Sequence, residues 1–325
     1  MNENEDQSTP KKAGKSKRAV FNFEREVFFA NKGDLLKYKD KYTHLVFEKL
    51  STKEILSELE EIESFSQYLK SIDLRYKGFS KKSHAYSRID TILEMFSLKA
   101  KNIEILKLSI NQSEINDQVM FKNIEKLTKL DSFSLNLNTS SFPTSLLVGI
   151  LKQLEGKSLK KFCLSLSQCD YDKAIFDQLK FFNTLESLKL NLSDNQRDEF
   201  SFECINQILD NNPHLTEINF NLNHISKFIE FDNFLISLLK LKDNIKSVKL
   251  MAYGNNLTVE ETIKLCDHLS KMENLKIIKI DLRKNYLNGI YEEDEKYKKL
   301  FQGIEGLKSH LRGPIEDPSN LKIFY

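Results

Sequence analysis

The stretch SLKLNLSDN, residues 187–195, alternates apolar and polar residues and then ends in small polar ones. Alternation with a period of two is typical of a short β-strand that buries one face, and the polar end is typical of the turn that follows it. Similar phrases occur four more times: FSLNLNTS from Phe133, FCLSLSQC from Phe162, INFNLNHI from Ile218 and IKIDLRKN from Ile278. The chain therefore repeats one strand-and-turn unit.

The repeat is clearest when the apolar residue three places before each phrase is aligned. This first column holds Ile103, Leu130, Leu159, Leu185, Leu215, Ile245 and Leu275, at spacings of 27, 29, 26, 30, 30 and 30 residues. Three further apolar columns follow it: Leu106, Phe133, Phe162, Leu188, Ile218, Val248 and Ile278; Leu108, Leu135, Leu164, Leu190, Phe220, Leu250 and Ile280; Ile110, Leu137, Leu166, Leu192, Leu222, Ala252 and Leu282. Seven units thus match at four positions, with a period of about 29 residues.

The pattern L-x-x-L-x-L at this period resembles the leucine-rich repeat, and the longer repeats of ribonuclease-inhibitor-like proteins in particular. The resemblance implies an α/β solenoid in which each unit contributes a strand, a turn, a helix and a second turn. No unit can bury its strand face and its helix face alone, so neighbouring units must stack. We therefore expect a horseshoe with a parallel inner sheet and outer helices.

Helix-start signals follow several of the strands. Thr258 and Glu261 have the spacing of a capping box, in which a hydroxyl and a carboxylate each accept a free backbone amide. Pro143 is predicted at the first position of one helix, and Asp170 at the cap of another. These signals support a helix between successive strands.

The sequence departs from the leucine-rich-repeat pattern at the position that usually holds an inward asparagine or cysteine. Five residues after the second column stand Asn111, Asn138, Ser167, Ser193, Asn223, Tyr253 and Arg283. The early units fit and the last two do not, and the extra fourth apolar column suggests a longer strand than is usual. The sequence therefore argues against a regular asparagine ladder.

The repeats suggest one elongated solenoid. LKSIDLRY, from Leu69, adds an eighth unit, and YTHLVF, from Tyr42, is a candidate ninth, so we expect about eight to nine repeats within residues 42–290. Residues 1–20 are predicted to form a disordered basic arm and residues 21–41 an N-terminal cap. Residues 291–325 are predicted to form a C-terminal cap and tail.

Composition narrows the class of protein. The chain has 325 residues and a mean hydropathy of −0.44, and it contains no apolar run long enough to span a membrane. Its first residues are polar and charged where a secretory signal would be apolar. We expect an intracellular protein, and the sequence leaves cytoplasm and nucleus undecided.

Motifs for catalysis or for metal binding are missing from the sequence. There is no phosphate-binding glycine loop, no GxSxG turn, no CxxC pair and no HExxH pair. The four cysteines, Cys163, Cys169, Cys204 and Cys266, are best explained as reduced thiols in or near the core. We therefore predict a non-enzymatic protein without cofactor or metal.

The register predicts which residues lie on the concave face. Three outward rows result: Ile105, Ser132, Lys161, Ser187, Glu217, Ser247 and Ile277; Lys107, Ser134, Cys163, Lys189, Asn219, Lys249 and Lys279; Ser109, Asn136, Ser165, Asn191, Asn221, Met251 and Asp281. The rows contain five lysines, two acidic residues and no aromatic residue. The candidate partner-binding residues are Lys107, Lys161, Lys189, Lys249 and Lys279, with Asn191 and Asn221, and an acidic partner fits them. The alternative is an ordinary solvated sheet face, with the partner docking elsewhere.

The N-terminal arm adds a second basic element. It contains Lys11, Lys12, Lys15, Lys17 and Arg18, and such a segment does not fold by itself. A solubilising tail, a nuclear-import signal and a contact with a polyanion would all use this charge. A net charge of only +2 argues against a dedicated nucleic-acid binder, although contact of the arm with nucleic acid stays open.

These observations favour a scaffold that binds a protein partner through the concave face and the basic arm, with the oligomeric state undetermined. The alternative is a regulatory subunit, either an F-box-like ubiquitin-ligase adaptor or a GTPase activator of the ribonuclease-inhibitor-like kind. The apolar run at residues 50–65 resembles an F-box module but lacks its usual proline and tryptophan. The abundance of Asn, Lys, Ile and Phe, with no tryptophan, resembles proteins of ciliates and other protists.

Overall fold

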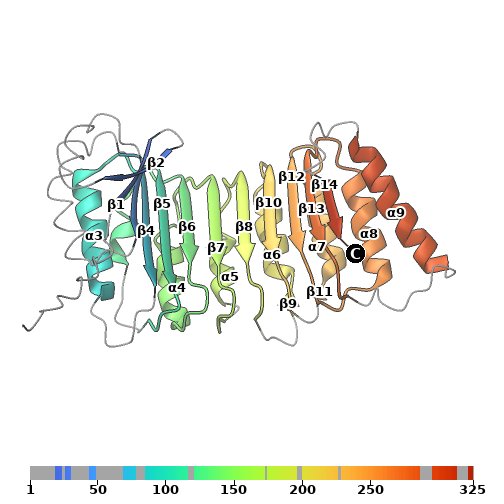
Figure 1. Ribbon diagram of the computed structural model, residues 1–325, viewed down its shortest axis with the longest axis horizontal. Helices are drawn as coiled ribbons and strands as arrows, with labels where there is room; N and C mark the ends of the chain where they lie inside the picture. Colours follow the sequence, from blue (N-terminus) through green and yellow to red (C-terminus); the bar gives the residue numbers. More distant parts are fainter. Residues whose placement is uncertain are drawn as a thin grey trace, which may run out of the picture.

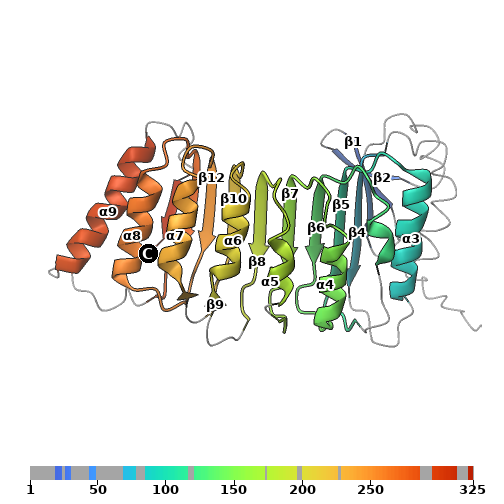
Figure 2. The same ribbon diagram turned by 180° about the vertical axis from the view of Figure 1, so that it is seen from behind.

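The computed structural model describes residues 19–23, 26–30, 44–48, 69–77, 85–115, 121–172, 174–195, 200–225, 228–285, 295–312 and 321–324. These residues form two layers (Figure 1), with one long sheet across the molecule and the helices on one side of it. Seen from behind, α4 to α8 cover one face of the sheet (Figure 2). Within the described ranges no helix lies on the other face, as expected for the concave face of a leucine-rich-repeat solenoid.

Twelve strands of the described part of the chain form the sheet, and ten of them run parallel. The parallel strands are β3 (His44–Glu48), β4 (Ser71–Lys77), β5 (Ile105–Asn111), β6 (Ser132–Asn136), β7 (Lys161–Ser165), β8 (Ser187–Asn191), β10 (Glu217–Asn221), β12 (Ser247–Met251), β13 (Ile277–Asp281) and β14 (Leu321–Phe324). At the N-terminal end, β1 (Ala19–Phe23) pairs antiparallel with both β2 (Glu26–Ala30) and β3.

The crossover helices differ in length from unit to unit. They are α3 (Ala85–Lys99), the 3₁₀ turn η3 (Lys122–Ile124), α4 (Thr144–Lys152), α5 (Ala174–Leu179), α6 (Glu203–Asn211), α7 (Phe231–Lys240), α8 (Val259–Ser270) and α9 (Glu295–Arg312). Two short strands, β9 (Phe200–Ser201) and β11 (Phe228–Ile229), pair in parallel outside the main sheet. The expected order of strand, turn, helix and turn is confirmed.

The strand register matches the apolar columns of the sequence. Leu190, for example, pairs with Leu164 on one side and with Phe220 on the other. Its side chain is only 1% exposed, in a core that runs continuously from Leu45 to Leu307. The candidate ninth unit is present as β3, where Leu45 pairs with Ile72. A tenth strand, β14, continues the sheet past β13, within the segment predicted as C-terminal cap and tail.

A left-handed residue follows every strand of the main sheet from β5 to β13. These residues are Gln112, Thr139, Gln168, Asp194, His224 and Lys284, with φ between 52° and 58°, and Gly254, with φ 67°. Non-glycine residues rarely adopt this conformation, so its recurrence shows that the turn geometry is imposed by the stacked array. At Gly254 a Cβ atom would lie 2.6 Å from Nδ1 of His224 in the preceding unit, so glycine relieves both the strain and a close contact.

The doubt about a regular asparagine ladder holds, but the buried column of the turns lies two residues later than the aligned position, and it mixes three asparagines with two serines, a cysteine and an isoleucine. The residues after the left-handed ones are Ser113, Ser140, Cys169, Asn195, Ile225, Asn255 and Asn285, and all are buried. The amide oxygen of Asn195 accepts from the backbone N–H of Cys169 at 2.7 Å, and its Nδ2 donates to the carbonyl oxygens of Leu166 and Leu192 at 3.0 and 2.6 Å. Asn255 likewise bonds the backbone of the preceding unit, accepting from Ile225 and donating to Leu222.

The shift arises because backbone pairing continues beyond the strands. The main-sheet strands from β6 to β13 have five residues each. The N–H groups of Leu137 and Thr139 nevertheless donate to the carbonyl oxygens of Ser165 and Ser167 in the next unit, at 2.9 and 2.8 Å. The fourth apolar column therefore belongs to the inward face, and the turn begins after it. The column from Asn111 to Arg283 lies at the concave edge instead of in the core.

The helix-start signals were partly right. Thr258 accepts from the backbone N–H of Glu261, and the Glu261 carboxylate accepts from the backbone N–H of Thr258, which confirms the capping box. Pro143 is the N-cap residue and not the first helical residue, since its ψ of 140° is extended. Near α5 the Asp172 carboxylate accepts the backbone N–H of Ala174 at 2.8 Å.

Candidate functional site

The concave face follows the three predicted rows. Backbone pairing places Lys107, Lys189, Lys249 and Lys279 in the middle row and Lys161 in the first row, as the sequence predicted. The end strands extend the rows, because Ser71, Asp73 and Arg75 of β4 pair with Ile105, Lys107 and Ser109, and Lys322 and Phe324 of β14 pair with Lys279 and Asp281.

Glu217 neutralises part of the predicted basic surface. Its carboxylate lies 3.2 Å from the Lys189 ammonium and 3.7 Å from that of Lys249, and it accepts a hydrogen bond from Ser187 at 2.9 Å. Partial burial raises the pKa of this carboxyl, but the hydrogen bonds from Ser187 and Lys189 and the charges of Lys189 and Lys249 outweigh it, so the pKa lies below its ordinary value. Two of the five candidate lysines are therefore already paired.

Three lysines lie on neighbouring strands toward the C-terminal end of the face. Lys249, Lys279 and Lys322 occupy the same row on the neighbouring strands β12, β13 and β14. Adjacent strands lie about 4.8 Å apart, so these ammonium groups repel one another. Of the three, only Lys249 forms an ion pair with the described residues. We name these three residues the lysine row.

The other candidate residues are not brought together with the lysine row. Lys107 lies on β5 and Lys161 on β7, both exposed and in different rows. Asn191 is engaged in the sheet, since its Nδ2 donates to Ser165 and its Oδ1 accepts from Ser193. Asn221 accepts from the backbone N–H of Asn223 at 3.4 Å. The arm residues Lys11, Lys12, Lys15, Lys17 and Arg18 lie outside the described residues, as does the F-box-like run at residues 50–65.

The structure adds aromatic and arginine side chains that the sequence reasoning did not assign to the face. Arg75 and Arg283 each bind an aspartate two residues earlier, Asp73 and Asp281, through Nε and Nη2. The Arg283 guanidinium also lies over the rings of Tyr253 and Phe324, 5.7 and 4.9 Å from their centroids. Tyr253 and Arg283 were visible as departures from the repeat. In LKIFY, residues 321–325, the apolar–polar alternation of a strand begins at Leu321, and it places Phe324 on the same side as Lys322.

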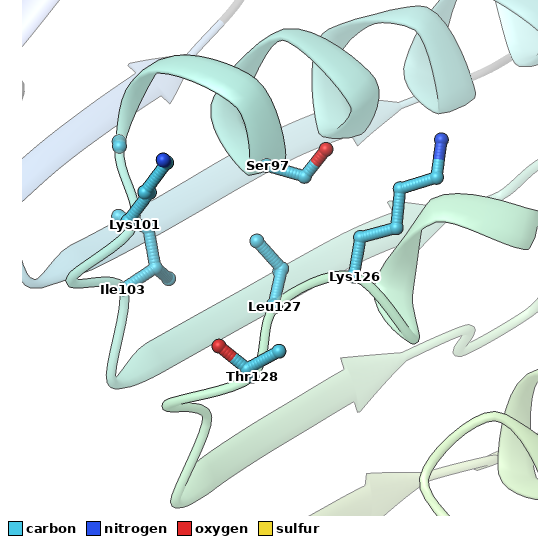
Figure 3. A pocket seen from close by; sticks show the side chains of 7 residues that line it. Ser97, Lys101, Ile103, Lys126, Leu127 and Thr128 are labelled. Atoms are coloured by element: carbon cyan, nitrogen blue, oxygen red, sulfur yellow. The ribbon is translucent and has the colours of Figure 1, made fainter.

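A small hollow lies at the opposite end of the solenoid, away from the lysine row. Ser97, Ala100 and Lys101 at the end of α3 line one side, and Lys126, Leu127 and Thr128 after η3 line the other (Figure 3). Its volume is about 220 Å³, below the ~300 Å³ at which small-molecule sites begin. Lys126 is also paired with Glu94 at 3.5 Å. These features do not mark a ligand site.

The described residues offer no constellation for metal chemistry or for a nucleophile. No group of three or more histidine, cysteine or acidic side chains there could hold a metal ion. Burial raises the pKa of the Cys266 thiol to about 12, and it also raises that of Cys169, so both thiols are protonated near neutral pH. No helix among the described residues is long and apolar enough to cross a membrane. What the face presents is charge, amide and aromatic groups suited to binding.

Comparison with known proteins gives similarity of structure only. No protein-family model and no curated protein matches the chain. Among solved structures, a protein from Bacteroides fragilis is 12% identical, with 90% of this chain and 68% of that chain covered and a TM-score of 0.39. An internalin (inlF) from Listeria monocytogenes is 13% identical, with 85% and 67% covered and a TM-score of 0.39. The leucine-rich-repeat domain of LRIM1 is 12% identical, with 84% and 83% covered and a TM-score of 0.35. The repeats and the parallel sheet of this chain itself define it as a leucine-rich-repeat solenoid.

Proposed function

We propose that this protein is a non-enzymatic scaffold that binds an acidic protein partner on its concave face. The observation that carries the proposal is the lysine row, Lys249, Lys279 and Lys322, on three neighbouring strands. Like charges directly opposite one another destabilise a sheet, so the fold gains nothing from this arrangement. A partner carboxylate seated between these ammonium groups would relieve their repulsion.

The ion pairs of Glu217 with Lys189 and Lys249 also support an acidic partner. Glu217 lies on β10, between the strands that carry Lys189 and Lys249, and its carboxylate is 3.2 and 3.7 Å from their ammonium groups. A carboxylate from the partner would form ion pairs with Lys279 and Lys322, as Glu217 does with Lys189 and Lys249. The basic arm, Lys11 to Arg18, would add long-range attraction for the same partner.

A ribonuclease-inhibitor-like subtype agrees with the repeat spacing of 26 to 30 residues and with α-helices in most crossovers. The regulatory-subunit alternative, an F-box-like adaptor or a GTPase activator, stays a prediction from the sequence. Its F-box-like run at residues 50–65 lies outside the described residues.

The test compares two double charge reversals that change the net charge equally. Lys279→Glu with Lys322→Glu alters the lysine row, whereas Lys152→Glu with Lys242→Glu alters exposed lysines at the end of α4 and just after α7. Binding of fluorescent poly-L-glutamate to the full chain is measured by anisotropy. We expect the first pair to weaken binding about tenfold or more, and the second about twofold. Equal losses from both pairs would overturn the proposal, because net charge alone would then explain the binding.

A further inference from the structure

Next to the lysine row lies a cluster of aromatic and cationic side chains at the carboxyl ends of the last three strands. Tyr253 follows β12, Arg283 and Lys284 follow β13, and Phe324 ends β14. Asp281 and Phe324 stand two residues beyond Lys279 and Lys322 on the same strands, so they face the same side of the sheet. We name Tyr253, Arg283, Lys284 and Phe324 the anchor cluster.

Arg283 is the centre of this cluster and is held in place on two sides. Its Nε and Nη2 donate to the two oxygens of Asp281 at 2.9 and 2.6 Å, and the Asp281 side chain is only 5% exposed. The guanidinium lies between the Tyr253 and Phe324 rings. A guanidinium has five N–H donors, so the two bonds to Asp281 leave three for a partner. The Arg283 side chain as a whole is 53% exposed.

The two rings are presented differently. The Tyr253 ring is enclosed by cationic and imidazole neighbours, with the Lys284 ammonium 5.2 Å from its centroid and the His224 ring 5.0 Å away, edge on. Phe324 is 42% exposed, although it is a large apolar side chain, and it stands in the same row as Asp281 and Met251. A half-exposed phenylalanine beside a fixed arginine has the composition of a protein interface, where aromatic residues and arginine are enriched.

We propose that the anchor cluster recognises an acidic segment of the partner protein that carries an aromatic residue next to its carboxylates. This inference rests on the proposed function and specifies the partner further. The aromatic side chain would pack against Phe324, and a neighbouring carboxylate would accept from the free N–H groups of Arg283. Further carboxylates would extend along Lys322 and Lys279, which lie on the same two strands.

Charge favours a protein segment over nucleic acid. Cationic and aromatic side chains also bind single-stranded nucleic acid, but such surfaces are strongly basic along their length. Here Asp281 is hydrogen-bonded to Arg283, and Glu217 lies on the same face. The net charge of the chain is only +2. A continuous phosphate backbone would meet both carboxylates, whereas a short acidic segment needs only the C-terminal end of the face.

The experiment uses the full chain and three fluorescent probes: a random copolymer of glutamate and tyrosine, poly-L-glutamate and an oligo-dT strand. The variants are Phe324→Ala and Arg283→Lys, and the second keeps the charge but loses the planar fork. The matched controls are Phe181→Ala, which removes a ring that is 46% exposed just beyond α5, and Arg75→Lys, which alters the same arginine–aspartate arrangement on β4. Thermal melting verifies that each variant is folded.

We expect the wild-type chain to bind the glutamate–tyrosine copolymer about five- to tenfold more tightly than poly-L-glutamate. Phe324→Ala and Arg283→Lys should each remove most of that preference, and the two control variants should keep it. Equal binding of the two polymers would overturn the anchor cluster while leaving the scaffold proposal intact. Binding of neither polymer would overturn both proposals. Oligo-dT binding as tight as that of the copolymer, and equally sensitive to Phe324→Ala, would assign the surface to nucleic acid instead.

Discussion

The buried polar ladder makes a sharp prediction, because two asparagines at similar places in the repeat should behave very differently. Asn195 is 3% exposed and makes three hydrogen bonds to the backbone, at 2.6 to 3.0 Å. Asn223 is half-buried at the concave edge, and its side chain accepts one backbone N–H, from Tyr253 at 2.9 Å. In the register expected from the sequence alone, Asn223 would have been the ladder residue.

Asn195→Ala removes all three bonds and leaves the N–H of Cys169 and the carbonyl oxygens of Leu166 and Leu192 without these partners. An unsatisfied buried group costs about 1 to 3 kcal/mol, so we expect a loss of about 3 to 5 kcal/mol in the free energy of unfolding. Asn223→Ala leaves one N–H without this partner, at a position that water can reach. We therefore expect the free energy of unfolding to fall by about 1 kcal/mol or less. Urea denaturation followed by circular dichroism measures both. A cost for Asn223→Ala equal to that for Asn195→Ala would refute the shifted ladder.

Three further predictions concern the core, the turns and the ion pairs. Leu190→Asp buries a carboxylate against the neighbouring strands, so we expect a loss of about 4 kcal/mol or more, and a thermal melt close to that of the wild type would show the register to be wrong. Thr139→Asn should stabilise the chain by about 1 kcal/mol, because asparagine tolerates a φ of 55° better than a β-branched residue does; a lower urea midpoint would contradict this. The lowered pKa of Glu217 makes its stabilising contribution complete above the ordinary value of 4.5, and the contribution is lost as the pH falls through the folded-state pKa. The stability advantage of the wild type over Glu217→Gln, measured by melting at a series of pH values, should therefore shrink as the pH falls below the ordinary value of 4.5, and an advantage that is independent of pH would exclude the ion pairs as its source.

Much of the fold could be predicted because alternation and register are linked. Each strand buries every second residue, so the columns through Leu106 and Leu108 determine which residues pair once the strands lie parallel. For the same reason the middle row of the concave face, from Lys107 to Lys279, could be written from the sequence and is confirmed by the pairing of the strands. The partner that binds this face stays a prediction.

Other features depend on geometry that the repeat pattern does not encode. The ladder was misplaced because backbone pairing continues past the five-residue strands, and the pattern does not show where pairing stops. Strand β14 was missed because its leading position holds Pro318 instead of an apolar repeat residue, and Leu321 follows Ile278 after 43 residues. The double pairing of Glu217 depends on the rotamers of Lys189 and Lys249. A count of charges along the rows therefore overestimated the free basic surface.

The most direct test of the scaffold proposal is the salt dependence of poly-L-glutamate binding to the full chain. Anisotropy titrations at increasing sodium chloride should show the affinity falling steadily, because salt screens exposed charges over about 8 to 10 Å near physiological ionic strength. The Lys279→Glu, Lys322→Glu chain should show a clearly shallower dependence than the Lys152→Glu, Lys242→Glu chain. An affinity that does not change with salt, or the same dependence in both variants, would contradict the claim that the lysine row binds an acidic partner.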